Sequence, residues 1–146
     1  MKNILLFLLI SLFLTSCTTF HNSSSVLHQK YLQYENTVNK NNIVEEARNF
    51  FSPSLLGNNY QYNPDAASQF LFKNYMVNTD SSFEEISGQE GCLTINGYDE
   101  DRLPLIFSLK YILSNENWLI DNIYVVFVES ENDFSNDAKC PTDYPN

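Results

Sequence analysis

Basic residues and histidines are scarce in this sequence. Its 146 residues include eight lysines and arginines against 18 aspartates and glutamates, a formal net charge of −10. Proteins that bind nucleic acid need a basic face for the phosphates, so this balance argues against nucleic acid as a partner. Anionic lipid headgroups also repel an acidic domain, so attachment to a membrane requires a separate anchor.

Histidine does not occur after residue 28. Both histidines, His21 and His28, lie near the N-terminus, so the easiest general base near neutral pH is missing from most of the chain. No Ser-His-Asp or Cys-His set can be assembled, and the four glycines form no phosphate-binding loop. The three cysteines include no Cys-x-x-Cys spacing, which argues against a metal site. No cofactor is predicted.

The longest apolar run, Ile4 to Leu14, is too short to cross a bilayer. As a helix its eleven residues span about 16 Å, roughly half of the hydrocarbon core. Lys2 precedes the run, and Thr15-Ser16-Cys17 follow its last residue, Leu14. This order is typical of a secretory signal peptide with a cysteine at the cleavage site.

The segment Leu14-Thr15-Ser16-Cys17 resembles the lipobox of bacterial lipoproteins. The resemblance implies that residues 1–16 are removed and that Cys17 carries a diacylglycerol thioether and an acylated amine, enough lipid for durable membrane attachment. An ordinary signal peptide that happens to contain a cysteine is the alternative. Thr18 stands where an aspartate would retain such proteins in the inner membrane, which favours the outer membrane, facing the periplasm. Residues 17–25 then form the lipidated cysteine and a short polar tether.

Apolar spacing changes from helical to extended along the chain. Helices are predicted at residues 26–38, at 43–51, where Ser52-Pro53 ends the helix, and from Asn63-Pro64 to about residue 76. Strands follow at about 83–86, 92–96, 103–113 and 118–128, with a turn at 114–117. Helices followed by antiparallel strands indicate the α+β class.

Two of the predicted strands show which faces should be buried. The residues that alternate in the third strand are expected to face the core: Leu103, Leu105, Phe107, Leu109 and Tyr111. The last strand is apolar on both faces, which predicts a central strand covered on both sides. Its Trp118 is expected to be buried beneath the helices.

Two cysteines lie outside the lipobox, Cys92 and Cys140, and exported chains with two thiols usually pair them. Because Leu93 and Ile95 face the core, Cys92 faces the opposite side of the sheet. The tail, residues 129–146, has some ten residues before Cys140 and can reach about 33 Å. We therefore expect the tail to cross the outer sheet face, or to wrap its edge, pinned by a Cys92–Cys140 disulfide.

The segment 105–123, with its Trp118-Leu-Ile120-Asp121-Asn-Ile123 motif, resembles the last hairpin of NTF2-like (cystatin-like) domains. Residues 41–56 resemble the second helix of these domains. The resemblance covers residues 26–128 and implies N-terminal helices packed on a bent antiparallel sheet that forms a cone. Exported lipoproteins of unknown function share this layout.

Several side chains are candidates for a site in such a cone. Those that could line a pocket are Tyr31, Tyr34, Tyr60, Tyr62, Tyr75 and Trp118; the alternative is that the tyrosines fill the core and its rim. Asp121 is a candidate acid or base, with a structural role at a strand twist as its alternative. Asp99-Glu100-Asp101 lacks the spacing of a calcium loop and is expected to be a solvated hairpin tip.

These features predict a membrane-tethered, non-catalytic binding or scaffold domain. It would contact an envelope protein, as an accessory subunit or an immunity-type factor, or form a homodimer. The alternative is a small-molecule binder or an enzyme that uses the interior of the cone. A cavity lined by convergent polar side chains would favour the alternative, whereas a filled cone would favour the first function.

The lipobox leads to the first testable prediction. Cys17→Ser should leave the precursor uncleaved and abolish labelling by radioactive fatty acid, because serine has no thiol to form the thioether. Gel mobility and lipid labelling in a bacterial host would measure both effects, with Cys92→Ser as the matched control. Normal processing and acylation of the Cys17→Ser protein would contradict the lipoprotein assignment.

Overall fold

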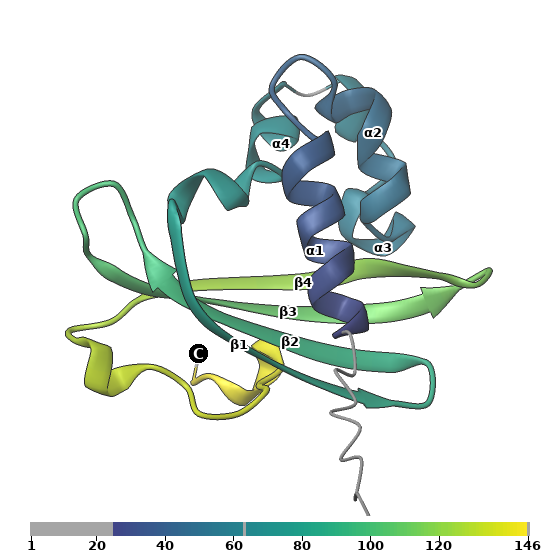
Figure 1. Ribbon diagram of the computed structural model, residues 1–146. Helices are drawn as coiled ribbons and strands as arrows, with labels where there is room; N and C mark the ends of the chain where they lie inside the picture. The colour runs from purple at the N-terminus through teal and green to yellow at the C-terminus, as the bar shows by residue number, and fades with distance from the viewer. Residues whose placement is uncertain (1–24, 63, 146) are drawn as a thin grey trace, which may run out of the picture.

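The computed structural model describes residues 25–62 and 64–145. The predicted signal peptide, Cys17, most of the tether and Asn63 lie outside these residues. The described chain has helices first and a four-stranded antiparallel sheet after them, which confirms the α+β class (Figure 1). Within the described residues, no helix is both long and apolar enough to span a membrane.

In the described part of the chain, four α-helices and two short 3-10 helices precede the sheet. Their bounds are α1 Val26–Thr37, α2 Ile43–Phe50, α3 Pro53–Leu56, η1 Tyr60–Tyr62, α4 Pro64–Gln69 and η2 Phe72–Tyr75. The predicted third helix is therefore not continuous, because it breaks at Phe70 and Leu71 into α4 and η2. Ser52-Pro53 not only follows α2 but also starts α3: Ser52 caps the helix and proline takes its first position.

The start of α1 is bound to the sheet. The backbone N–H groups of Val26, Leu27 and His28 donate to the Glu84 carboxylate over 2.8, 2.9 and 3.1 Å. The Ser25 hydroxyl donates to the same carboxylate. Glu84 thus satisfies N–H groups that have no partner inside the helix, and its negative charge suits the helix N-terminus.

The sheet is a simple meander. Its strands are β1 Asn78–Ser87, β2 Glu90–Tyr98, β3 Pro104–Ser114 and β4 Asn117–Phe127, and their spatial order is β1-β2-β3-β4. β4 is therefore an edge strand, and its prediction as a central strand is wrong. Its two apolar faces have another cause: α2 and α3 contact this strand, and the C-terminal tail also reaches it.

β2 continues beyond its predicted end at residue 96. Gly97 pairs with Thr79 on one side and Leu105 on the other. A Cβ atom at this position would lie 2.3 Å from the carbonyl oxygen of Asn78 and 2.6 Å from the Met76 sulfur. Glycine is therefore required by the close approach of the chain entering β1, not by a turn.

The helices cover one face of the sheet. Four of the five predicted core residues of β3 are buried there, namely Leu105, Phe107, Leu109 and Tyr111. Leu103 precedes the strand and is 53% exposed. Trp118 is half-buried at the edge of the core, not covered as expected, because it pairs with Leu113 near the end of the β3–β4 hairpin.

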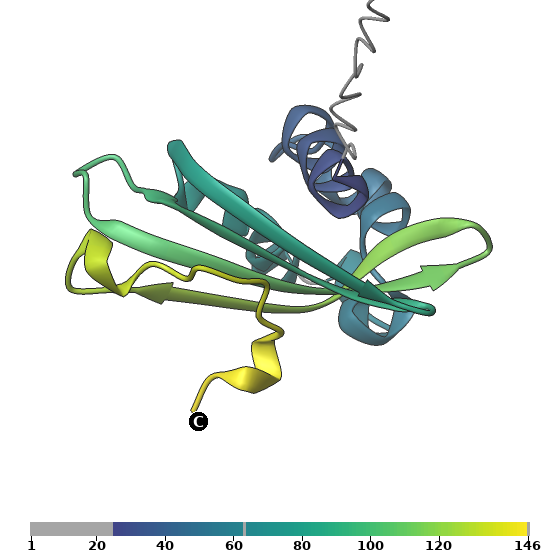
Figure 2. The ribbon, with the colours of Figure 1, turned by 60° about the horizontal axis from the view of Figure 1, so that its bottom comes forward.

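The C-terminal tail crosses the opposite face of the sheet, as predicted (Figure 2). The Asn96 side chain donates to the carbonyl of Ser135 at 2.9 Å and accepts from the N–H of Ser135 at 3.2 Å. The Thr94 hydroxyl accepts from the Lys139 N–H at 2.8 Å, and the Ser108 hydroxyl donates to the Lys139 carbonyl. The tail therefore supplies partners for outward polar side chains of β2 and β3 that are fully buried beneath it.

Cys92 and Cys140 lie at disulfide distance, with Cα atoms 5.0 Å apart. Cys92 is on the same outer face as Thr94 and Asn96, as period-two alternation predicts. This placement is compatible with the predicted disulfide, which would fix the tail near its end in addition to its hydrogen bonds.

The disulfide leads to a second prediction. A Cys92→Ala/Cys140→Ala double variant should lose up to about 4 kcal/mol of unfolding free energy, because a loop of this length no longer restricts the unfolded chain. Urea denaturation would measure the loss, and trypsin cleavage after Lys139 should become faster. The oxidised protein carrying Ser54→Ala serves as the control. Equal denaturation midpoints and equal cleavage rates would contradict a stapled tail.

Candidate functional site

Tyr31 and Tyr34 are core residues. The Tyr34 ring stacks on Phe72 at 5.3 Å between centroids, and Tyr31 meets Phe107 edge-on at 6.4 Å. The Tyr34 hydroxyl donates to the carbonyl of Phe70 at 2.5 Å. These rings fill the space between the helices and the sheet where a ligand inside a cone would lie.

Tyr111 completes this aromatic core from β3. It is fully buried, and its hydroxyl makes no hydrogen bond to any described residue. Burial raises the pKa of Tyr31, Tyr34 and Tyr111, so all three hydroxyls stay neutral at physiological pH. They cannot serve as phenolate bases there.

The other aromatic candidates lie apart from this group. Tyr62 is 83% exposed and Tyr75 is 58% exposed, whereas Trp118 lies at the edge of the core. Tyr60 is buried but has its hydroxyl at the wall of an open pocket. The structure therefore does not bring the six predicted residues together in one site.

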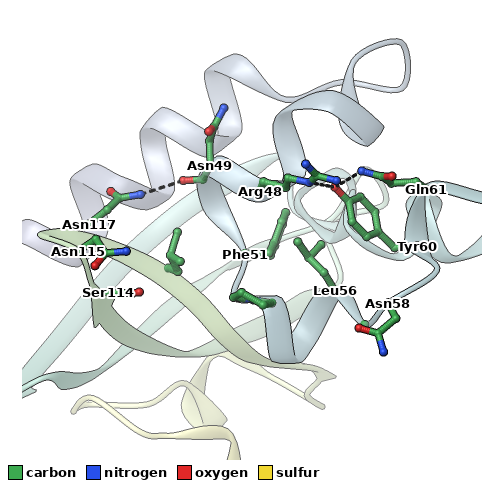
Figure 3. A pocket seen from close by; sticks show the side chains of 13 residues that line it. Arg48, Asn49, Phe51, Leu56, Asn58, Tyr60, Gln61, Ser114, Asn115 and Asn117 are labelled. Atoms are coloured by element: carbon green, nitrogen blue, oxygen red, sulfur yellow. Dashed lines mark hydrogen bonds between the residues drawn. The ribbon is translucent and has the colours of Figure 1, made fainter.

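That pocket, with a volume of about 530 Å³, lies between α2, α3 and the β3–β4 hairpin (Figure 3). Most of its polar side chains are carboxamides, so we call it the amide pocket. Its polar lining residues are Arg48, Asn49, Asn58, Gln61, Ser114, Asn115 and Asn117, and the remainder are Phe51, Pro53, Leu56, Gly57, Tyr60 and Leu119. None of these lining residues is an aspartate or a glutamate.

One wall of the amide pocket depends on the junction between α2 and α3. The Ser52 hydroxyl accepts from the N–H of Leu55 at 3.1 Å and donates to the Asp121 carboxylate at 2.6 Å. The Ser52 N–H donates to the carbonyl of Ile120 at 2.8 Å. Because Ser52 is fully buried, these bonds fix the junction against β4.

Asp121 holds this junction from a bulge in β4. The pairing with β3 passes from Asn122 to Ile120, so Asp121 is the extra residue of the bulge. Its carboxylate accepts a hydrogen bond from the Ser52 hydroxyl and thereby positions the pocket wall. This contact agrees with the structural alternative for Asp121.

The opposite wall is the β3–β4 hairpin. Asn115 and Glu116 form its turn with φ values of 49° and 64°, a left-handed conformation that asparagine tolerates well. The Asn117 amide donates to the carbonyl of Asn49 at 3.2 Å and accepts from the Lys30 ammonium at 2.7 Å. These two bonds tie the hairpin to α2 and α1.

Tyr60 organises the polar end of the pocket. Figure 3 shows Arg48 and Gln61 converging on the Tyr60 hydroxyl, which accepts from their side chains at 3.0 and 3.4 Å. The hydroxyl donates in turn to the carbonyl of Val44 at 3.3 Å. Within the described part of the chain Arg48 makes no ion pair. Its Nε is thus held by a neutral oxygen, and its two terminal amino groups bond no other described residue.

Sequence reasoning missed Arg48 and the carboxamides of this pocket. Asn58, next to Gly57, and Asn115 are recognisable from the sequence only as turn residues. They are far apart in the chain, so nothing in the sequence indicates that they line the same pocket. Their convergence depends on how the α2–α3 junction docks on β4, which residue spacing alone does not predict. In the sequence, only Asp121, within the Trp118-Leu-Ile120-Asp121-Asn-Ile123 motif, indicated a contact that could dock this junction on β4.

Among the described residues, no three His, Cys, Asp or Glu side chains are grouped as possible metal ligands. The acidic segment 99–101 lies in the loop between β2 and β3, as expected of a hairpin connection. There the Asp99 carboxylate accepts from the N–H of Leu103 at 2.7 Å and so stabilises the loop itself.

The Ser52 contacts lead to a third prediction. Ser52→Ala should lower the unfolding free energy by roughly 1–2 kcal/mol, because it removes the cap of α3 and leaves the Asp121 carboxylate without its partner. Ser54→Ala makes the same chemical change at an exposed position of α3 and should have little effect. Thermal unfolding of both variants would measure the difference. Equal stabilities would show that Ser52 does not hold the junction.

Comparison of the chain with protein-family models found no match. Comparisons with curated proteins and with solved structures also found none. The amide pocket is therefore characterised by its own geometry: one guanidinium and several carboxamides around an apolar floor, at the edge of a sheet whose helix-covered face is filled with aromatic rings.

Proposed function

We propose that this chain is a lipid-anchored, non-catalytic binding domain of the bacterial envelope. It holds a segment of an envelope protein in the amide pocket, as an accessory subunit or an immunity-type factor. The proposal rests on the amide pocket, which is open and polar and has each of its two walls fixed by a hydrogen bond. Concave sites with a few fixed polar groups over an apolar floor are typical binding sites.

The packing of the core supports binding outside the sheet–helix interface. In an NTF2-like cone a ligand would lie between the sheet and the helices. Here Tyr31, Tyr34, Phe72 and Phe107 occupy that space with rings 5.2–6.4 Å apart. We therefore favour a filled NTF2-like architecture over the alternative of a small-molecule binder or an enzyme that uses the interior of the cone.

The outer face of the sheet is a weaker candidate for contact with a partner. The tail already occupies it and satisfies the buried polar side chains of Thr94, Asn96 and Ser108. Tyr144 of the tail also stacks on Tyr124 of β4 at 4.6 Å. A partner would have to displace these contacts, whereas the amide pocket is open.

The position of the proposed anchor agrees with this arrangement. The tether from Cys17 would join α1 at Ser25, which is bonded to Glu84 on β1, one edge of the sheet. The amide pocket lies against β4, the other edge. A domain held on the periplasmic side of the outer membrane would thus have its attachment point and its binding site at different edges.

Site-specific crosslinking would test the proposal. A photoreactive amino acid at Asn58, on the exposed rim of the amide pocket, should give an adduct of discrete mass in intact envelopes. The same amino acid at Glu100, in the β2–β3 loop, serves as the control and should give none. Adduct formation at Glu100 alone, or at neither position, would contradict binding of an envelope protein in the pocket.

A further inference from the structure

The amide pocket lacks acidic residues although the protein is strongly acidic. The chain has 18 acidic residues, yet none lines this pocket. Two other concave regions of the described surface do contain them: one is lined by Glu84, Glu85 and Asp137, another by Glu129 and Glu131. A third region, next to α2, has none, but it is lined mainly by apolar side chains. Arg48 is thus the only charged lining residue of the amide pocket, which makes it locally favourable for an anion.

The Arg48 guanidinium is held in a geometry that leaves one edge free. Its Nε donates to the Tyr60 hydroxyl at 3.0 Å, and within the described residues the two terminal amino groups have no hydrogen-bond partner. Two terminal N–H groups of a guanidinium match the two oxygens of a carboxylate in parallel. Tyr60 is itself fixed, because it is buried and bonded to Val44. The Arg48 side chain is therefore partly ordered before a ligand binds, which lowers the entropy cost of binding.

The carboxamides suit peptide groups. Each carries a donor and an acceptor, as a peptide bond does. The side chains of Asn58 and Asn115 make no hydrogen bonds to other described residues, and Gln61 uses only its amide nitrogen. Between them lie Leu56 and other apolar lining residues, which can contact a small apolar side chain.

We infer that the amide pocket recognises a peptide that carries a free carboxylate. The carboxylate binds the terminal amino groups of Arg48, and the adjoining peptide groups bind the carboxamides of Asn58, Gln61 and Asn115. This inference rests on the proposed function and names the chemistry by which its site selects a ligand. The carboxylate can belong to a chain end or to an acidic side chain.

Matched peptides distinguish these sources. The probes are acetyl-trialanine as the free acid and as the amide, and acetyl-alanyl-aspartyl-alanine amide with its asparaginyl counterpart. Titration of the full chain, followed by the side-chain NMR signals of Arg48 and the pocket carboxamides, would measure binding. A carboxylate peptide should bind with a Kd on the order of 1 mM, as expected of a small fragment. Its neutral counterpart should bind at least about tenfold more weakly, since it loses a charge-assisted bond. A difference within the trialanine pair would identify a chain-end carboxylate as the ligand. A difference within the aspartyl–asparaginyl pair would identify an acidic side chain.

Two variants of equal charge make the test specific. Arg48→Gln should reduce binding of the carboxylate peptide about tenfold or more. Arg102→Gln removes the only other arginine, which lies in the β2–β3 loop, and should leave binding unchanged. Tyr60→Phe keeps the ring but frees Arg48, and should weaken binding several-fold with an unchanged circular dichroism spectrum.

Equal binding of acidic and neutral peptides, equal losses in the two arginine variants, or no saturable shift with any peptide would overturn the inference. None of these results depends on the crosslinking experiment. An adduct at Asn58 combined with no preference for carboxylate would retain the proposed function and reject only the ligand chemistry. Preference for carboxylate without an adduct would retain the site and reject the protein partner.

Discussion

The burial of polar side chains on the outer face of the sheet imposes the strongest constraint on this fold. Thr94, Asn96 and Ser108 have no exposed surface, and a buried polar group without a partner is costly. Their partners are backbone groups of the tail at Ser135 and Lys139. The domain therefore does not end with its last strand, because a third layer of irregular chain is needed to complete the sheet.

The α2–α3 junction combines protection of a sheet edge with construction of the amide pocket. β4 is an edge strand, and exposed edges invite pairing with other chains. Phe51 forms a bridge to Ile120, and the Ser52 N–H bonds the Ile120 carbonyl, so part of this edge is occupied. The same docking places Arg48, at the end of α2, opposite the hairpin. One local contact thus both limits edge pairing and determines where the concave surface forms.

Local features of this fold were predictable from the sequence, whereas features that depend on docking were not. Period-two alternation around Cys92 predicted the face to which the tail is attached, because alternation needs no tertiary information. The apolar pattern of β4 could not distinguish a central strand from an edge strand covered on both faces. Tyr31 and Tyr34 were predicted as candidate site residues and lie in the core, since a tyrosine suits either place. Arg48 gave no signal, because its position in the pocket depends on a hydrogen bond to Tyr60, twelve residues further along the chain.

The Glu84 contact with α1 has a mechanical consequence. A pull on the N-terminus reaches the domain at Ser25 and passes through Glu84 into β1. Glu84 pairs with Leu93, and the adjacent Glu85 pairs with Cys92, so the load continues into β2 next to the cysteine that joins the tail. A force applied at Ser25 is therefore resisted by β1 and β2 as well as by α1. The same force also reaches the amide pocket along α1, because Lys30 of this helix bonds Asn117 in the pocket wall.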